Sequence, residues 1–315
     1  MAGASSAIAV SGLRKSFGDK VVLDGIDLDV REGTTFCMLG PNGAGKTTAV
    51  RILSTLIGFD GGRAWVAGHD VVTEADAVRA AIGVTGQFSA VDDLLTGEEN
   101  LALMADLNHL ARAEGRRRVT DLLARFDLTD AAAKLVSTYS GGMRRRLDLA
   151  MTLVGDPRVI FLDEPTTGLD PRSRHTMWET IRGLVAGGVT IFLTTQYLDE
   201  ADELADRVSV LDHGHIVAEG TTDELKRRVP GGHVLLRFAD VHELDSAARI
   251  LGDTTSDPES LTLTVPNDGS RRALKGLLDR LDDASVETEA LTVHTPDLDD
   301  VFFALTGHPT EETVR

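Results

Sequence analysis

The chain has 315 residues, which is long enough for one large domain and a smaller one. Its 32 Lys and Arg against 50 Asp and Glu give a formal net charge of −18, which argues against a broad nucleic-acid-binding surface. No apolar run approaches the roughly 20 residues that span a bilayer, and residues 1–10 lack the basic start of a signal peptide, so we expect a cytoplasmic protein without direct membrane insertion.

Residues 7–30 contain short apolar runs separated by turn residues, which predicts antiparallel strands beside a strand at residues 34–39. Phe17 lies at one of the turns, and an aromatic ring there could stack on an adenine base. The simpler alternative is an ordinary apolar residue beside a hairpin. This segment alone does not separate the two interpretations.

A glycine-rich stretch at residues 40–48 matches the phosphate-binding pattern G-x-x-x-x-G-K-[ST] at every fixed position. An apolar, β-branched run precedes it at residues 34–39, and a run with helical spacing follows at residues 49–56. A glycine-rich turn between strand and helix directs backbone N–H groups and the helix dipole at one place, where a polyphosphate belongs. The stretch consists of Gly40, Pro41, Asn42, Gly43, Ala44, Gly45, Lys46, Thr47 and Thr48.

Three side chains of this stretch have roles if it binds a nucleotide. Lys46 would reach the β- and γ-phosphates, the hydroxyl of Thr47 would bind Mg²⁺, and Thr48 could add a phosphate contact. The alternative, a solvated lysine in a glycine-rich turn, would produce this pattern by chance in about one such chain in a hundred. The single cysteine, Cys37, excludes an internal disulfide and lies in the apolar run, where we expect it to pack.

The next part of the chain mixes strand and helix patterns. Residues 80–85 predict a strand that ends just before Gln87. The spacing of apolar residues then becomes helical, which indicates a helical insertion at about residues 88–155.

Ser140 opens a further amphipathic helix as a good N-cap. Gly141 and Gly142 are not needed for a cap, but they would let backbone N–H groups approach an anion closely. The three arginines at residues 144–146 are more typical of a solvated helix face or local ion pairs than of a polyanion groove.

An apolar strand at residues 159–163 ends in two adjacent carboxylates, Asp163 and Glu164. Neighbouring residues of a strand point to opposite faces, so one carboxylate can serve Mg²⁺ and the other can polarise a water molecule. An ordinary turn is the plain alternative, but a phosphate loop requires such an Asp. Residues 188–195 predict one more buried strand, and Gln196 follows it.

The pattern of strands and helices restarts after about residue 229. Residues 261–265 alternate Leu or Val with Thr, as a half-buried strand does. We predict a large nucleotide-binding domain at residues 1–229 and a small α/β accessory domain at residues 230–315, which contains no catalytic constellation.

Together these motifs resemble the ATP-binding subunit of an ATP-binding-cassette (ABC) transporter over about residues 7–228. The matching motifs are the Walker A loop at residues 40–48, the Q-loop glutamine Gln87, the signature at residues 139–143, the Walker B strand at residues 159–163, the catalytic glutamate Glu164 and the D-loop at residues 167–170, which ends in Asp170. Their order and spacing are far more specific than the first loop alone.

The resemblance implies a P-loop α/β fold with a mixed sheet, an antiparallel β edge and an inserted helical subdomain. It also implies a homodimer in the ATP-bound state, in which the signature of one subunit contacts the ATP held by the Walker A loop of the other. The resemblance implies that four residues contact the nucleotide: Ser140, Gly141, Gly142 and Asp170. Asp163 and Thr47 would bind Mg²⁺, and Gln87 would sense the metal. Glu164 would act as general base, and Lys46 would stabilise the transferring phosphoryl group.

Three positions depart from the usual pattern of the family. Phe17 stands where a tyrosine stacks on adenine, Met143 replaces a glutamine of the signature, and Gln196 stands where the switch histidine is expected. A glutamine amide can donate a hydrogen bond to a phosphate, but it cannot titrate near neutrality. We therefore predict that Gln196 is a neutral phosphate sensor and that Glu164 is the sole base.

Three stretches resemble the daunorubicin/doxorubicin-resistance branch of drug exporters: Gln196, residues 82–87 and the tail at residues 296–307. This resemblance implies an ATPase that powers efflux of a hydrophobic drug through a separate membrane permease, which would hold it at the inner face of the cell membrane. One alternative is an ABC ATPase for import or for lipid or polysaccharide export, and another is a soluble cassette protein acting on ribosomes or DNA. A third is an interaction module without catalysis, and the presence of Glu164 argues against this one.

Overall fold

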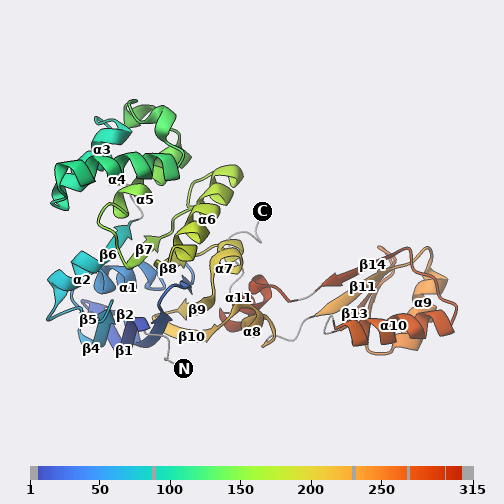
Figure 1. Cartoon of the computed structure of the whole chain (residues 1–315). Coiled ribbons are helices and arrows are strands. Elements are labelled where there is room, and N and C mark those ends of the chain that lie inside the picture. Colours follow the sequence, from blue (N-terminus) through green and yellow to red (C-terminus); the bar gives the residue numbers. More distant parts are fainter. Residues whose placement is uncertain (1–5, 87–89, 229–231, 268–269, 295, 307–315) are drawn as a thin grey trace, which may run out of the picture. The chain divides into compact units, whose positions relative to one another are not determined.

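The computed structural model describes residues 6–86, 90–228, 232–267, 270–294 and 296–306. The chain divides into two compact units, Met1–Thr222 and Asp223–Arg315 (Figure 1). The first unit contains two sheets and an inserted group of helices, and the second unit contains a sheet of its own.

The first sheet has the order β2-β1-β4-β5 and is antiparallel. Its strands are β1 (Ser6–Phe17), β2 (Lys20–Arg31), β4 (Gly61–Val66) and β5 (His69–Asp70). The predicted pairing of residues 7–30 with the strand at residues 34–39 is wrong, because both edges of that strand, β3 (Thr35–Leu39), are taken by other strands. The N-terminal strands therefore form a separate layer.

The second sheet has six strands in the order β10-β9-β3-β8-β7-β6, all parallel except the antiparallel edge strand β10. The strands not yet given are β6 (Ile82–Thr85), β7 (Val159–Asp163), β8 (Thr190–Thr195), β9 (Arg207–Asp212) and β10 (His215–Gly220). Every residue of β3, β7 and β8 is buried, as expected of central parallel strands. This is the mixed α/β core expected from the phosphate loop and its flanking strands.

Three phenylalanines hold the centre of this sheet against the N-terminal layer. Phe36 and Phe161 pair in register with Phe192 on the strand between them, and the ring centroids lie 5.6 and 5.5 Å from that of Phe192. All three are fully buried in a core that also contains apolar residues of β1, β2 and β4. Burial of each such ring contributes roughly 1.5–3 kcal/mol.

Helices follow most strands of the first unit. They are α1 (Lys46–Leu53), α2 (Ala75–Ala81), α3 (Gly97–Leu107), α4 (Arg112–Arg125), α5 (Gly141–Thr152), α6 (Pro171–Ala186) and α7 (Leu198–Leu204), with short 3₁₀ turns at Thr129–Ala131 and Val136–Thr138. The predicted insertion consists of α3, α4 and α5, and Thr96 and Glu99 form a capping box at its first helix. Buried Leu101, Val119 and Leu122 form its own apolar interior.

The second unit has an antiparallel sheet in the order β12-β13-β11-β14, with α9 and α10 packed against it (Figure 1). Its elements are α8 (Thr222–Lys226), β11 (His233–Arg237), α9 (Val241–Leu251), β12 (Thr255–Asp257), β13 (Thr262–Pro266), α10 (Arg271–Asp283), β14 (Ala290–His294) and α11 (Leu298–Thr306). Leu263 and Val265 of β13 are buried and alternate with half-buried Thr262 and Thr264, as predicted.

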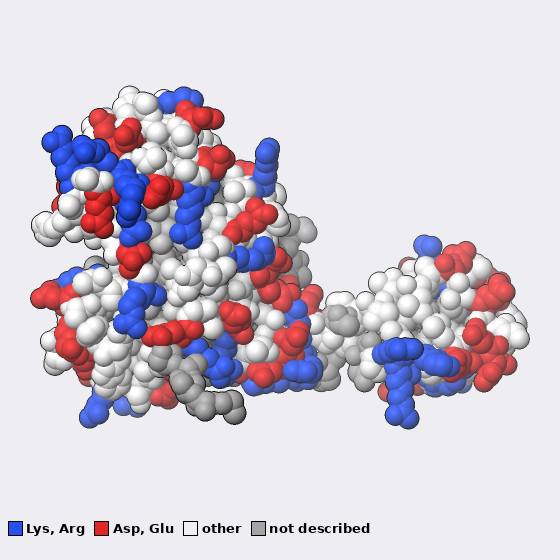
Figure 2. Space-filling view, in the orientation of Figure 1, with Lys and Arg blue, Asp and Glu red and all other residues white. Residues whose placement is uncertain are grey.

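Within the part of the chain that the structure describes, none of the helices has the length and apolar content to cross a bilayer. Figure 2 shows acidic and basic side chains interspersed over the visible face of each unit.

Candidate functional site

The loop between β3 and α1 takes a path that only glycine permits at two positions. Gly45 has φ 117°, and a Cβ added there would lie 2.8 Å from the carbonyl oxygen of Val22. A Cβ on Gly40 would lie 2.3 Å from the carbonyl oxygen of Leu211. The local packing therefore requires these two fixed glycines of the pattern. With them, the loop lies directly over the carboxyl edge of the parallel strands.

A cavity of about 430 Å³ opens over this loop, a size usual for a small-molecule site. It is lined by Phe17, Lys20, Val22, Asn42, Gly43, Gly45, Lys46, Thr47, Thr48 and Glu164. Phe17 is 53% exposed, and the ammonium of Lys15 lies 5.1 Å from its ring centroid. The structure thus brings the predicted stacking ring, the phosphate loop and the predicted base to one cavity.

Three neighbouring parallel strands bring the remaining predicted groups to the same edge. The N–H of Gly40 donates to the carbonyl of Thr195 at 3.3 Å, and the N–H of Glu164 donates to the carbonyl of Thr194 at 3.0 Å. Gln196 follows Thr195 directly and is half-buried. The carboxyl edge of a parallel sheet is where α/β proteins bind ligands.

Lys46 is almost fully buried, and three oxygens hold its ammonium. The carbonyls of Gly40 and Pro41 accept from Nζ at 2.7 and 3.1 Å, and Oε1 of Glu164 lies 3.6 Å away. Burial lowers the pKa of Lys46 below its ordinary value, while the charge of Glu164 acts in the opposite direction. The lysine is thus tied to the loop and to the expected base at once.

Asp163 lies beneath the loop with a different set of partners. The hydroxyls of Thr47 and Thr194 donate to its Oδ1 at 3.2 and 2.5 Å. A buried carboxylate beside a hydroxyl fits Mg²⁺, which takes hard oxygen ligands and usually only one or two carboxylates from a protein. Among the described residues, no cluster of three or more His, Cys, Asp or Glu side chains could hold a metal ion by itself.

The signature residues begin α5, and Gly141 and Gly142 differ from each other in their surroundings. Ser140 is the N-cap, and its side chain accepts from the N–H of Met143 at 3.2 Å. A Cβ on Gly142 would lie 2.6 Å from Oγ of Ser173, whereas a Cβ on Gly141 would meet only Leu169 at 4.0 Å. Gly142 is therefore required by packing inside the subunit, and Gly141 is not.

Asp170 caps α6, with its Oδ1 and Oδ2 accepting from the N–H and hydroxyl of Ser173 at 3.0 and 2.6 Å. These hydrogen bonds lower the pKa of Asp170.

Gln87 lies outside the described residues. Cys37 is buried and unpaired, as predicted, and burial raises the pKa of its thiol.

Several buried polar groups around the site are not predicted by the sequence patterns. Largely buried Arg145 and fully buried Asp148 form an ion pair at 3.1 Å beside the turn after β7, and Glu200 is fully buried between Thr166 and Trp178. The three arginines of this run form ion pairs, as one of the two expectations had it, but the solvated helix face does not hold for Arg145, whose side chain is only 11% exposed. Asp148, a charge on the otherwise apolar side of α5, is the one signal in the sequence that points to a buried pair.

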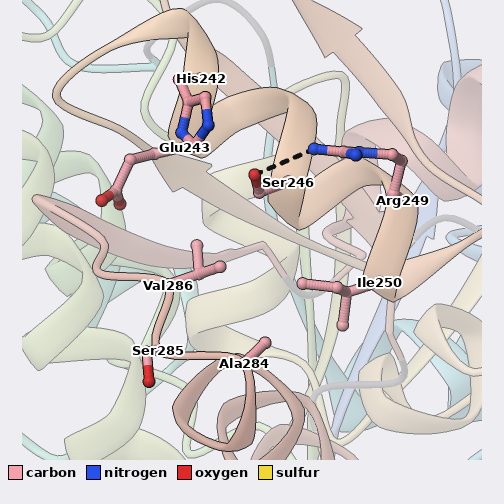
Figure 3. A pocket seen from close by; sticks show the side chains of 8 residues that line it. All are labelled: His242, Glu243, Ser246, Arg249, Ile250, Ala284, Ser285 and Val286. Atoms are coloured by element: carbon pink, nitrogen blue, oxygen red, sulfur yellow. Dashed lines mark hydrogen bonds between the residues drawn. The ribbon is translucent and has the colours of Figure 1, made fainter.

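A second cavity, of about 350 Å³, lies in the C-terminal unit between α9 and residues 284–286 (Figure 3). Arg249 turns back to Oγ of Ser246 at 3.1 Å, and Glu243 accepts from the N–H of Glu287 at 3.1 Å. These side chains are used in local structure, and the cavity brings together none of the motifs described above.

Comparisons with known proteins agree with this geometry. The family model described as ABC transporter matches residues 23–167. The "Daunorubicin resistance ATP-binding protein DrrA3" of Streptomyces coeruleorubidus is 51% identical over 96% of this chain and 97% of its own length. The "Daunorubicin/doxorubicin resistance ATP-binding protein DrrA" of Streptomyces peucetius is 47% identical over 97% of this chain and 94% of its own length. A solved structure, an ATP-binding subunit of an ABC transporter, superposes with a TM-score of 0.64 at 27% identity, covering 71% of this chain and 93% of that one.

Proposed function

The chain belongs to the family of ABC transporter ATP-binding subunits, which bind and hydrolyse ATP, and from this membership we propose that it powers the efflux of a hydrophobic drug or antibiotic through a separate membrane permease. The observation that carries the proposal is the identity of 51% with a daunorubicin resistance protein over nearly the whole of both chains. The permease would hold the chain at the inner face of the cell membrane.

Lys46 and Glu164 support a simple sequence of events at the phosphate loop. A triphosphate offers the Lys46 ammonium several charged oxygens, and hydrogen bonds between charged partners are stronger than those to neutral carbonyls. Nζ of Lys46 lies 3.6 Å from Oε1 of Glu164. ATP would therefore draw Lys46 away from Glu164 and leave the Glu164 carboxylate to accept a proton from the attacking water. Lys46 would then balance the charge that develops on the transferring phosphoryl group.

Asp163 and Thr47 are the side chains that would hold Mg²⁺, because their oxygens already lie together at 3.2 Å under the loop. The ion supplies charge neutralisation of the phosphates when it is bound. Thr194 holds Oδ1 of Asp163 from the neighbouring strand and so fixes the orientation of that carboxylate. Phe17 lines the same cavity and presents the ring on which the adenine would stack.

The signature would act across a dimer of two such chains. Within its own subunit a Cβ on Gly141 would make only an ordinary contact with Leu169 at 4.0 Å, so the missing side chain would serve a contact outside that subunit. Together with Ser140 and Gly142 it would present N–H and hydroxyl groups to the γ-phosphate of the partner subunit's ATP. Binding energy of ATP would then close the dimer, and hydrolysis would release it.

Export is tested with the chain as it exists in its membrane. A tagged copy is purified from source-cell membranes together with the integral membrane protein that retains it, and the complex is placed in lipid vesicles. We expect ATP-dependent daunorubicin accumulation, followed by the fluorescence of the drug, and none with Glu164→Gln. Hydrolysis without drug movement would keep the ATPase but refute this substrate class. Retention by no membrane protein would refute the transport role.

A further inference from the structure

Arg145 joins the signature helix to the turn that carries the expected base. Its side chain is 11% exposed and projects from the second turn of α5. Nε donates to the carbonyl of Pro165 at 2.8 Å, and Nη2 lies 3.4 Å from the carbonyl oxygens of Asp163 and Glu164. One guanidinium thus faces three successive carbonyls at the end of β7.

Asp148 sets the direction of this guanidinium. Its Oδ2 accepts from Nη1 of Arg145 at 3.1 Å, and its Oδ1 accepts from the N–H of Ala90 at 3.1 Å. Nη1 also donates to the carbonyl of Gly86 at 2.9 Å. A rigid planar donor with a buried counter-ion is well suited to hold backbone groups from separate segments in one arrangement.

Glu164 needs such support because its backbone is in a left-handed conformation, with φ 51°. Residues other than glycine adopt this conformation rarely and keep it only where their surroundings impose it. On one side, the N–H of Glu164 is fixed to the carbonyl of Thr194 in β8. On the other side, the carbonyls of Glu164 and its neighbours face Arg145.

We propose that Arg145, oriented by Asp148, is a positioning residue for hydrolysis, which holds the backbone of Glu164 so that its carboxylate meets the water at the phosphate loop. The proposal rests on the role of Glu164 as the base. Arg145 is not among the residues that line the cavity, so ATP binding should not depend on it. The same contacts of Arg145 connect the helix capped by Ser140 to residues 163–165 at the end of β7 in its own subunit.

The test compares two arginines of the same helix. Arg146 is 18% exposed and bonds instead to the carbonyl of Phe126 at 2.9 Å and to Asp127 at 3.2 Å. We expect Arg145→Met to lower kcat by roughly 10- to 100-fold, as misplaced catalytic groups do, with the Kd for ATP changed by less than about twofold. Arg146→Met should leave both near native values. Equal losses of kcat in the two variants, or a loss of ATP affinity in Arg145→Met, would overturn the proposal.

Arg145→Lys covers the case in which Arg145→Met fails to fold. A lysine keeps the ion pair with Asp148, but a single ammonium cannot face three carbonyls, so we expect a folded protein that is more stable than Arg145→Met, with kcat still reduced. Full recovery of kcat would mean that only the charge matters and would refute positioning by the planar group.

A double-mutant cycle asks whether Arg145 acts through Glu164. In a Glu164→Gln background, adding Arg145→Lys should leave the slow residual hydrolysis unchanged, because no base remains to be placed. A further loss would refute action through Glu164. If Glu164→Gln alone hydrolyses ATP at the native rate, the proposed base itself is wrong, whatever the Arg145 variants do.

Discussion

Nζ of Lys46 lies 3.6 Å from Oε1 of Glu164, inside the cavity above the phosphate loop. Both side chains are largely buried, so the two opposite charges compensate each other away from water. A ligand that takes the ammonium must also free the carboxylate. Binding of the phosphates and release of the base are thereby linked through one ion pair.

Lys46→Met should weaken ATP binding roughly 10- to 100-fold, since a hydrogen bond to a charged group contributes about 1.5–3 kcal/mol, and should abolish measurable hydrolysis. Titration with a fluorescent ATP analogue and assay of released phosphate would measure the two effects. Lys20→Met is the matched control, because Lys20 lines the same cavity but is exposed. Native affinity in Lys46→Met, or an equal loss in Lys20→Met, would contradict the assignment.

The ion pair illustrates what the sequence can predict. The phosphate loop, the acidic pair Asp163 and Glu164 and the cap at Ser140 are local patterns, and each is recognisable from its neighbours in the chain. The contact between Lys46 and Glu164 depends instead on the order of β3, β8 and β7 in the sheet. The burial of Arg145 escapes prediction for a related reason, because a run of three arginines does not show which one turns inward.

Glu200 should make the stability of the first unit depend on pH. It is fully buried, Oε1 accepts from Thr166 at 2.8 Å and from Trp178 at 3.2 Å, and Oε2 has no hydrogen-bond partner within the described chain. Burial raises the pKa of Glu200 above its ordinary value of 4.5, although its hydrogen bonds act in the opposite direction. The folded state therefore binds this proton more tightly than the unfolded chain does.

The stability that Glu200 contributes is complete below its ordinary pKa and is lost as the pH rises through the raised value, about 1.4 kcal/mol for each unit of the shift. We expect the free energy of unfolding of the native protein, relative to Glu200→Gln, to be lower near pH 8 than near pH 5. Urea unfolding followed by tryptophan fluorescence measures it, because Trp65 and Trp178 both lie in the first unit. Parallel pH curves for the two proteins would show that the buried acid does not titrate in this range.

Gln196 should support hydrolysis without introducing its own titration. It stands at the end of β8, next to the residue that binds the N–H of Gly40. If its amide donates to the γ-phosphate, Gln196→Ala should lower kcat by about 10- to 100-fold, the usual cost of one such donor. Gln196→His should add a pH dependence near the ordinary pKa of histidine, about 6.5, which the native rate lacks. Unchanged turnover and ATP-driven dimerisation in Gln196→Ala would remove this role.

The two glycines of the signature should respond differently to alanine. In Gly142→Ala the new Cβ meets Ser173, whose hydroxyl is bonded to Asp170 at 2.6 Å, so the side chain cannot rotate away without breaking that hydrogen bond. We expect a loss of about 1–3 kcal/mol in the free energy of unfolding, as for other overpacked sites. Ser173→Gly, made in the Gly142→Ala background, should recover part of that loss.

Gly141→Ala should fold as well as the native protein, because the added methyl group makes only an ordinary contact with Leu169 at 4.0 Å and alanine favours a helix. If Gly141 faces the partner subunit's ATP, the same methyl group should block the ATP-bound dimer. The comparison is made in the Glu164→Gln background, where slow hydrolysis lets the dimer accumulate on a sizing column with ATP. A dimer that forms equally well with Ala at this position would place Gly141 away from the interface, whereas monomer at native stability would assign its missing side chain to contact between subunits.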